Sequence, residues 1–142
     1  MIIRPLLAGD LPAVGAIQAL SPETPAWPAE SYLETICLAA VEAQGELAET
    51  VLGFASARQS APQEAEILNL AVHPAARRRG IARALLTSLL QGLTGEVFLE
   101  VRASNLAAIQ LYESLQFARV GIRPAYYSHP TEDGVVLRLQ AC

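Results

Sequence analysis

Lysine is absent from this chain of 142 residues, and all ten basic residues are arginine. The absence argues strongly against a P-loop nucleotide-binding site, which needs a Gly-Lys-Ser/Thr motif. No Gly-x-Gly-x-x-Gly motif follows the first predicted strand, so a Rossmann dinucleotide site is not expected either. The two cysteines, Cys37 and Cys142, are too few for a disulfide framework or a zinc site, and we predict no bound metal.

Long apolar runs are also missing. No run reaches the roughly 18–20 residues that span a bilayer, and the segment after Met1 lacks the charged and apolar regions of a signal peptide. A hydrophobic fraction of 52% with 17% charged residues excludes a disordered chain. We therefore expect one monomeric, cytoplasmic domain over residues 1–142 that does not bind a membrane, with both cysteines as free thiols.

Acidic residues are unevenly placed in a chain whose net charge is −4. None occurs between Ile67 and Gly95, although four of the ten arginines fall there. The acidic balance argues against direct nucleic-acid binding and is compatible with a cationic partner. The sequence thus predicts a local cationic patch on an otherwise acidic protein.

The hydrophobic pattern changes period along the chain and predicts a mixed α/β fold. Ile81, Leu85 and Leu89 recur at the spacing of one helix face. The strand–helix–strand unit from Glu64 to Val101 predicts one parallel crossover, and strands adjacent in sequence favour antiparallel pairing. We expect one mixed, mostly antiparallel sheet with helices on both faces, in the order β-α-α-β-β-β-α-β-α-β-β. Strands are predicted at 2–5, 38–44, 51–58, 64–72, 96–101, 117–123 and 135–139, and helices at 10–20, 29–38, 78–92 and onward from 105.

The segment from Val72 to Arg83 lies between a predicted strand and a predicted helix and is rich in arginine. Unpaired N–H groups and the positive dipole end of a helix N-terminus favour an anion. Gly80 allows close approach of the backbone, and arginine donates two hydrogen bonds to phosphate. The segment predicts a phosphate site, most simply for a pyrophosphate. The alternative is an arginine run that only solvates the helix start, which costs stability because positive charge opposes the dipole.

Several motifs in the second half of the chain occur together. They are Arg77-x-x-Gly80-x-Ala82, then Leu99-Glu100-Val101-Arg102-Ala103-Ser104-Asn105, Ala107-Ala108-Ile109, Leu111-Tyr112-Glu113-Ser114-Leu115, Phe117 and Arg123-x-x-Tyr126-Tyr127. This pattern resembles the GCN5-related N-acetyltransferases (GNAT superfamily), and within them the RimI-type ribosomal-protein-alanine N-acetyltransferases. Trp27-Pro28 stands where that group carries a tryptophan in an early loop. The resemblance is dense from Leu68 to Tyr127 and thin before it.

The resemblance implies the GNAT fold, acetyl-CoA as co-substrate and a role for each matching residue. Glu100 would be the general base and Tyr112 the general acid, while Asn105 would contact the pantetheine arm. Trp27 and Tyr127 would bind the acceptor. The strand end at Leu70, Ala71 and Val72 would polarise the thioester carbonyl through its backbone. The pyrophosphate would be held by Arg77, Arg78, Arg79, Gly80, Ile81, Ala82 and Arg83.

Residue chemistry supports the first two roles and leaves alternatives open. An α-amine with a pKa near 7.7–8.0 is mostly protonated at neutral pH, so a carboxylate is needed to take its proton. Conversely, Glu100 could be an exposed strand-end residue paired with Arg102, and Tyr112 could be a packing residue on an apolar helix face. Tyr127 could line an amine pocket or cover the sheet, and Trp27 could cap the core.

The function that these patterns favour is N-α-acetylation of the terminal alanine of a ribosomal protein. The amine would attack the thioester directly, because Cys37 and Cys142 are poorly placed for a covalent intermediate. Glu23 and Glu30 would attract a cationic N-terminus. Acetylation of a small-molecule amine and a non-catalytic acyl-CoA-binding module remain the alternatives.

Gln116 departs from the family pattern, which places glycine before the residue equivalent to Phe117. A glycine there would end the helix in a left-handed conformation. We therefore predict that Gln116 adopts the same conformation under strain. A second departure, Ala82 in place of the commoner glycine, narrows the turn of the phosphate site.

Overall fold

Seven strands and three α-helices, joined by short 3₁₀ segments, make up the computed structural model, which describes residues 1–25, 27–46 and 48–141. The strands are β1 (Ile2–Pro5), β2 (Ile36–Ala43), β3 (Glu49–Ala61), β4 (Glu64–Val72), β5 (Gly95–Arg102), β6 (Ala118–Tyr127) and β7 (Glu132–Ala141). The helices are α1 (Leu11–Ala19), α2 (Ile81–Gln91) and α3 (Leu106–Ser114), with 3₁₀ segments η1 (Ala8–Asp10), η2 (Ala29–Glu34) and η3 (Pro74–Ala76). Among the described residues, no helix is long and apolar enough to cross a membrane.

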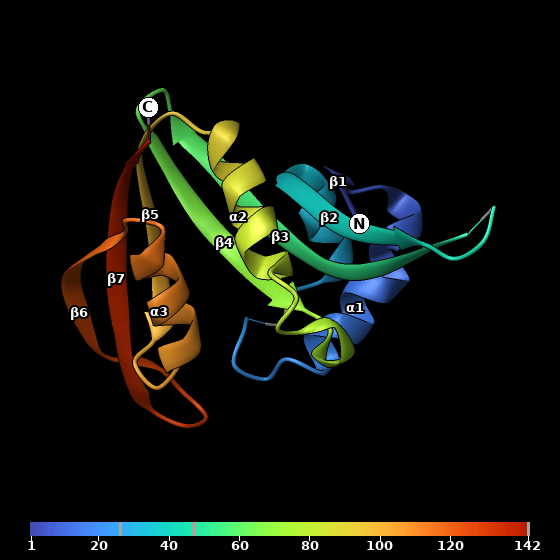
Figure 1. Cartoon of the computed structure of the whole chain (residues 1–142). Helices are drawn as coiled ribbons and strands as arrows, with labels where there is room; N and C mark the ends of the chain where they lie inside the picture. Colours follow the sequence, from blue (N-terminus) through green and yellow to red (C-terminus); the bar gives the residue numbers. More distant parts are fainter. Residues whose placement is uncertain (26, 47, 142) are drawn as a thin grey trace.

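One sheet contains all seven strands in the order β1-β2-β3-β4-β5-β7-β6 (Figure 1). Every neighbouring pair is antiparallel except β4 and β5, which are parallel and are connected through α2. The predicted mixed sheet with a single parallel crossover is confirmed. The crossover matters for function because it directs the carboxyl ends of β4 and β5 toward the same edge of the sheet, where ligands bind in such folds.

β4 and β5 separate soon after they pair. Only Glu64–Glu66 of β4 lie opposite Glu96–Phe98 of β5. Beyond these residues β4 continues to Val72 along β3, and β5 continues to Arg102 along β7. Figure 1 shows the two strands diverging toward their carboxyl ends. The divergence leaves their facing backbone groups without a sheet partner and opens the gap in which the candidate site lies.

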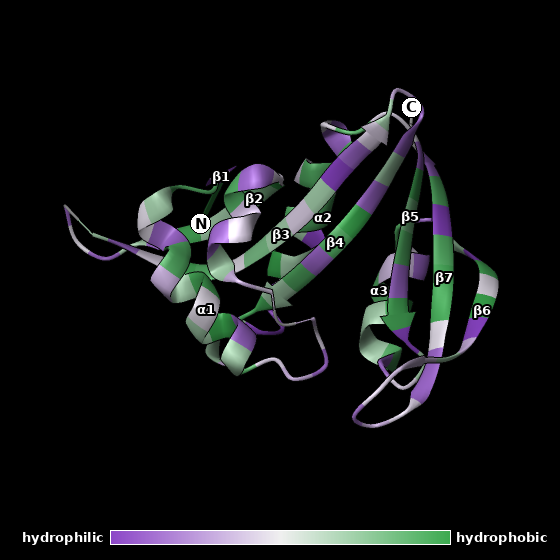
Figure 2. Ribbon diagram, turned by 180° about the vertical axis from the view of Figure 1, so that it is seen from behind, coloured by the Kyte–Doolittle hydropathy of each residue, from purple (hydrophilic) through white to green (hydrophobic). Residues whose placement is uncertain are grey.

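Helices cover both faces of the sheet, as predicted. α2 and α3 pack on one face around a large apolar cluster that includes Leu85, Leu89 and Ile109. On the other face α1 and η2 form a smaller cluster around Ile17, Tyr32 and other residues. Seen from behind, α1 lies in front of β3 and β4, whereas α2 lies behind them (Figure 2). Alternation of apolar side chains along the central strands supplies both clusters.

The second predicted helix, over residues 29–38, is wrong in its type and its length. The structure contains only the 3₁₀ segment η2, and the chain is extended from Ile36 onward. β2 lies between β1 and β3 and pairs with both, and the hydrogen bonds and burial of a central strand outweigh weak helix propensity. Cys37, which we placed on a helix, is therefore a buried residue of β2. Cys142 lies outside the described residues.

Gln116 adopts the left-handed conformation that the sequence predicts, with φ of 78° at the end of α3. Phe117 N–H donates to the Tyr112 carbonyl oxygen at 3.1 Å, which closes the helix end. We expect Gln116→Gly to raise the free energy of unfolding by about 0.5–1 kcal/mol, because relief of a left-handed side chain exceeds the added chain entropy of glycine. The melting temperature should rise by about 2–4 °C.

Gln110→Gly is the matched control for this prediction, since Gln110 is exposed in the interior of α3 and has no positive φ. The same chemical change there should lower stability by about 1 kcal/mol. If both variants lowered the melting temperature, the strain assigned to Gln116 would be absent.

Candidate active site

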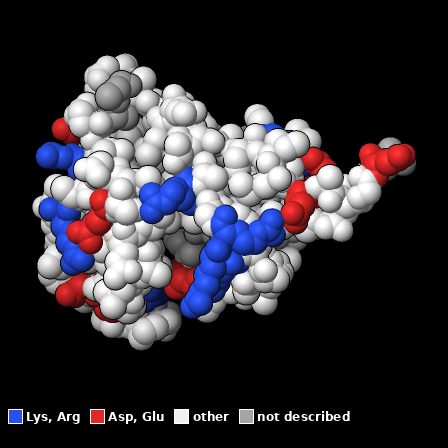
Figure 3. Space-filling view, viewed as in Figure 1, with Lys and Arg blue, Asp and Glu red and all other residues white. Residues whose placement is uncertain are grey.

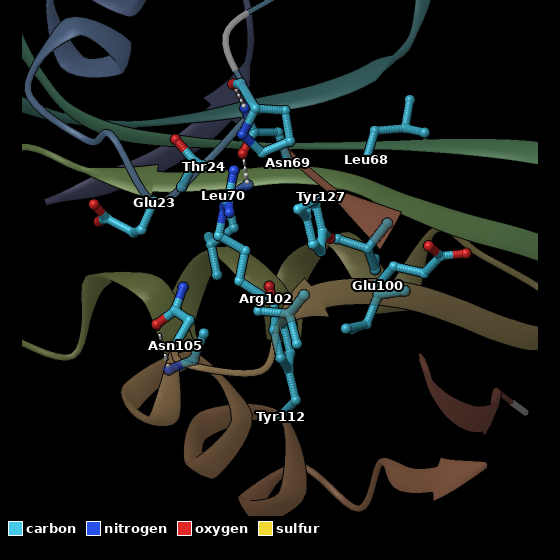
Figure 4. Close-up of a pocket in the computed structure, with 15 residues that line it drawn as sticks. Glu23, Thr24, Leu68, Asn69, Leu70, Glu100, Arg102, Asn105, Tyr112 and Tyr127 are labelled. Carbon is cyan, nitrogen blue, oxygen red and sulfur yellow. Dashed lines mark hydrogen bonds between the residues drawn. The ribbon is translucent and has the colours of Figure 1, made fainter. Parts of the chain in front are cut away.

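A cavity of about 180 Å³ occupies the gap between the diverging strands (Figure 4). β4, β5 and α3 form most of its wall, and the loop between α1 and η2 closes one side. We call it the central cavity. It is lined by Glu23, Thr24, Pro25, Ile67, Leu68, Asn69, Leu70, Leu99, Glu100, Val101, Arg102, Asn105, Ala108, Tyr112 and Tyr127. The predicted site residues Leu70, Glu100, Asn105, Tyr112 and Tyr127 are thus brought together around one space.

Tyr112 extends from α3 toward the central cavity (Figure 4). Its ring is 7% exposed and meets the Phe117 ring edge-on at 5.7 Å between centroids. Burial raises the pKa of the Tyr112 hydroxyl, so this group keeps its proton through the neutral range. Among the residues that the structure describes, no hydrogen bond engages that hydroxyl. Tyr112 is therefore a packing residue that also brings a protonated hydroxyl to the cavity wall.

Glu100 lies on the face of β5 opposite to Tyr112. Leu99 and Val101 point into the apolar cluster that contains Tyr112, and alternation along the strand directs Glu100 to the other side. Figure 4 shows its carboxylate directed away from Asn105. Glu100 also lines a second cavity, of about 310 Å³, formed with Glu64, Glu66, Phe98 and other residues on that face. Glu100 thus borders both the central cavity and the second cavity on the other face of the sheet.

The Glu100 carboxylate uses only one of its two oxygens in contacts. Oε1 lies 3.0 Å from Nε of Arg123, which is on β6 and largely exposed. Oε2 is buried and has no hydrogen-bond partner among the described residues. The pairing with Arg102 that the sequence left open does not occur, because Arg102 pairs with Glu132 instead. A buried carboxylate oxygen without a donor has an unused hydrogen-bond acceptor site.

Asn105 begins α3 as the sequence predicts. Its Oδ1 accepts the Ala108 N–H at 3.3 Å, so the carbonyl side of the amide serves as the helix cap. Figure 4 shows the amide nitrogen on the cavity side. The cap therefore orients Asn105 so that its Nδ2 donor faces the space between β4 and α3.

Tyr127 lines the cavity rather than only covering the sheet. The Arg102 guanidinium lies 4.7 Å from the ring centroid, and Tyr126 meets the ring edge-on. Burial, aided by the negative charge of Glu100, raises the pKa of Tyr127 to about 12. Arg102 in turn donates to the carbonyl oxygens of Ser128 and Pro130. This network holds the turn between β6 and β7 beside the cavity.

The arginine-rich turn forms a separate cavity of about 190 Å³ at the N-terminus of α2, which we call the anion slot. It is lined by Val72, Ala76, Arg77, Arg78, Gly80, Ile81, Ala82, Arg83 and Leu111. Arg78 and Gly80 have φ of 64° and 76°, a backbone geometry typical of concave anion-binding turns. The first helical hydrogen bond runs from Ala84 N–H to Gly80, so the preceding N–H groups have no carbonyl within the helix.

Two of the arginines make ion pairs beside the anion slot. Arg77 donates to the Val72 carbonyl oxygen at 3.3 Å and lies 3.5 Å from Glu23. Arg79 lies 3.0 Å from Glu42 of β2 and is not among the residues that line the slot, and its role at the pyrophosphate stays a prediction. This partly exposed ion pair with Glu42 directs the Arg79 side chain away from the slot. Figure 3 shows the cationic patch over the start of α2 with acidic groups next to it.

Leu70 and Val72 direct their backbone groups toward the gap, and the Leu70 N–H already donates to Asn69 Oδ1 at 2.9 Å. His73 N–H donates to Leu52 of β3, so hydrogen-bonding direction alternates and Ala71 also faces β3. The Ala71 side chain is buried against α1 in the smaller apolar cluster. Ala71 therefore lines neither the central cavity nor the anion slot.

Trp27 is likewise not among the residues that line the cavity. Its ring stacks on Tyr32 at 5.9 Å with an angle of 7° between the planes. Trp27 thus caps the smaller apolar cluster, which is one of the two placements that the sequence left open. Stacking on another aromatic ring buries much of the apolar surface of a tryptophan. The structure also adds Asn69 and Thr24 to the cavity wall. The sequence could have indicated Asn69 as a site residue, since it is the one amide side chain within the apolar run Ile67–Val72.

The family model described as "Acetyltransferase (GNAT) family" matches residues 12–117. The chain belongs to this family, and the resemblance drawn from the motifs is confirmed.

Curated relatives narrow the comparison further. The chain is 51% identical over 75 residues to the [Ribosomal protein bS18]-alanine N-acetyltransferase of Escherichia coli K12, covering 50% of this chain and 49% of that protein. It is 41% identical over 93 residues to the N-alpha-acetyltransferase RimI of Mycobacterium tuberculosis, covering 63% of this chain and 59% of that protein. The aligned part of the chain thus spans about half the length of the curated relatives.

Solved structures match over nearly the whole chain. The ribosomal-protein-S18-alanine N-acetyltransferase from Escherichia coli superposes with a TM-score of 0.78 at 32% identity, covering 99% of this chain and 93% of the other. Arabidopsis thaliana NAA60 in complex with acetyl-CoA gives a TM-score of 0.84 at 21% identity, covering 97% of each chain. The second match shows the shared fold.

Proposed function

We propose that the chain transfers the acetyl group of acetyl-CoA to a primary amine, the N-terminal amine of alanine in a ribosomal protein. The observation that carries the proposal is the placement of Glu100 and Tyr112 on opposite faces of the sheet, beside one gap. A thioester in this gap would have a carboxylate on one side, to receive a proton from the amine. It would have a phenol on the other side, to meet the sulfur.

Three features of the chain suit acetyl-CoA. The anion slot offers arginine side chains and free helix N–H groups to a pyrophosphate. The gap offers the Val72 N–H and the Leu70 carbonyl oxygen to an extended pantetheine arm, as an added strand would receive them. The Leu70 N–H is held by Asn69 Oδ1 and the Val72 carbonyl oxygen by Arg77. Asn105 offers its Nδ2 at the far side of the same gap. These features support a ligand that runs from the start of α2 to the central cavity.

The proposed reaction is a direct displacement. Glu100 Oε2 accepts the proton of the attacking amine while the new N–C bond forms and the C–S bond of the thioester breaks. The Tyr112 hydroxyl donates a hydrogen bond and then a proton to the departing sulfur. A thiol has a pKa near 8.5, below that of tyrosine, so full proton transfer from Tyr112 gives little driving force. The hydrogen bond that stabilises the developing thiolate is therefore the main contribution of Tyr112 to catalysis. CoA leaves as the thiol, and solvent then restores the proton of Tyr112 and takes the proton from Glu100.

A covalent acetyl-cysteine step has no support within the described residues. Cys37 is buried on β2, and burial raises the pKa of its thiol to about 12, so almost no thiolate is present at neutral pH. Cys37 also does not line the central cavity. We therefore expect both substrates to be bound together before the acetyl group moves.

Arg78→Ala is expected to raise the KM for acetyl-CoA about tenfold with little change in kcat, because it removes a phosphate contact of about 1.4 kcal/mol. Alanine keeps the Cβ at the left-handed φ of Arg78, so the backbone strain is unchanged. Arg79→Ala is the matched control, since Arg79 pairs with Glu42 and does not line the slot. Steady-state kinetics should show a smaller effect for the control; equal effects would contradict this division of roles.

The acceptor is supported by the names of the relatives and by acidic groups near the cavity. Glu23 lines the central cavity beside Arg77 and would attract a cationic N-terminus there, whereas Glu30 is not among the lining residues. A panel of acceptors with acetyl-CoA tests the proposal: an alanine-starting peptide, the same peptide with a blocked N-terminus, free amino acids and a polyamine. Acetylation of the first alone is expected. Preference for free amino acids or the polyamine would instead indicate a small-molecule acetyltransferase. No turnover with any amine would favour a non-catalytic acyl-CoA-binding module.

A further inference from the structure

A chain of buried polar side chains connects α1, η2 and β4 on the face opposite to α2. Gln18, Tyr32 and Asn69 are 9%, 0% and 4% exposed. Asn69 Nδ2 donates to the Tyr32 hydroxyl oxygen at 2.8 Å, and that hydroxyl donates to Gln18 Oε1 at 2.5 Å. Polar groups this deeply buried are retained only where their hydrogen bonds are satisfied.

Both ends of this chain hold the backbone of the loop between α1 and η2. Asn69 Nδ2 also donates to the Pro25 carbonyl oxygen at 3.0 Å. Gln18 Nε2 donates to the Trp27 carbonyl oxygen at 2.9 Å, and Gln18 Oε1 accepts the Trp27 N–H at 3.2 Å. The loop is therefore fixed through three backbone groups, independently of the side chains that it presents.

The same loop supplies one wall of the central cavity through Glu23, Thr24 and Pro25. Asn69, on β4, lines that cavity too and is labelled beside Thr24 and Leu70 in Figure 4. Its Oδ1 accepts the Leu70 N–H at 2.9 Å. One amide side chain thus contacts both the loop wall and the strand that faces the gap.

We propose that Gln18, Tyr32 and Asn69 are positioning residues, a polar clamp that fixes the loop wall of the central cavity and so sets the affinity for the acceptor. The inference rests on the proposed function for its substrate and on the hydrogen bonds above for its geometry. None of the three residues needs to touch the reacting atoms. The clamp acts because a loop free to move would have to be ordered each time an acceptor binds.

Tyr32→Phe is the sharpest test, because it removes one oxygen and keeps the ring that stacks on Trp27. It breaks the link between Asn69 and Gln18 but leaves the Asn69 bond to Leu70 in place. The KM for the alanine peptide should rise about fivefold to tenfold, and the KM for acetyl-CoA should stay within about twofold. Hydrogen exchange of the Glu23, Thr24 and Trp27 amides should become at least about tenfold faster.

Ser56→Ala is the matched control. Ser56 is fully buried, lies opposite Asn69 on β3 and shares a hydrogen bond of 2.8 Å with Thr35. Its hydroxyl is hydrogen-bonded to Thr35 and it does not line the central cavity, so the variant should lower stability without changing the KM for the peptide or the exchange of the loop. If Tyr32→Phe does not fold, the same KM and hydrogen-exchange measurements are made on Gln18→Met, which removes both hydrogen bonds to Trp27.

Each of three outcomes overturns the clamp: unchanged loop exchange in both clamp variants, the same changes in Ser56→Ala, or an equal rise of both KM values. If the wild-type chain acetylates no alanine peptide, the proposed function fails. Hydrogen exchange still decides the clamp in that case, with faster exchange in the clamp variants supporting it and unchanged exchange refuting it.

Discussion

Tyr112→Phe is expected to lower kcat about 100-fold and to change the KM for acetyl-CoA by less than about threefold. The phenol oxygen faces the central cavity, where it would meet the sulfur of a thioester. Phenylalanine keeps the edge-on contact with Phe117 and the burial of the ring, so the fold should not change. Steady-state kinetics with an alanine peptide and a melting curve measure the two effects separately.

Tyr126→Phe makes the same chemical change at an exposed tyrosine on β6 that does not line the central cavity. Its turnover should equal that of the wild type. If Tyr112→Phe also kept kcat within about threefold, Tyr112 would be a packing residue only, and the proton would reach the sulfur from another source.

Glu100→Gln is expected to lower kcat about 100-fold to 1,000-fold at neutral pH, because the amide cannot accept the proton of the amine. The deficit should shrink as the pH rises through about 8, where a terminal α-amine loses its proton to solvent without help. The sign follows from the substrate: more free amine at high pH substitutes for the missing base. A kcat/KM profile of wild type and variant over the alkaline range measures this.

Arg123→Ala separates the base from the ion pair. Glu100 Oε1 pairs with Arg123, so loss of that pair alone is a second explanation for any effect at Glu100. Arg123 is 58% exposed, and its removal should cost less than about 1 kcal/mol of stability and leave most of the turnover. Equal losses in Arg123→Ala and Glu100→Gln would assign the effect to the pair. Glu66→Gln, on β4 beside the second cavity, is the matched carboxylate control.

Periodicity predicted the central elements well because their patterns are strong and local. The strand over residues 64–72 and the amphipathic helix that follows it were predicted nearly to their ends. The predicted helix over residues 29–38 failed because the outcome depends on β1 and β3, which pair with β2 from distant positions in the sequence. A local pattern contains no information about such partners.

The candidate site could be predicted only in part. The motifs singled out Glu100, Tyr112, Asn105 and Tyr127, and the fold places all four around one cavity. Their catalytic and binding roles stay predictions. Side-chain directions were not accessible from the sequence: Arg79 turns to Glu42, and Trp27 stacks on Tyr32. The contacts of Asn69 with residues as distant as Pro25 arise only when α1 packs on β4. Such contacts are properties of the fold.

The most direct measurement compares the N-termini of ribosomal proteins from cells that lack this chain with those from cells that carry it. Mass spectrometry should show a terminal alanine that is acetylated when the wild-type chain is present and free when it is absent. We expect Glu100→Gln, expressed at the same level, not to restore the acetyl group. An unchanged set of acetylated ribosomal N-termini, or full restoration by Glu100→Gln, would contradict the account.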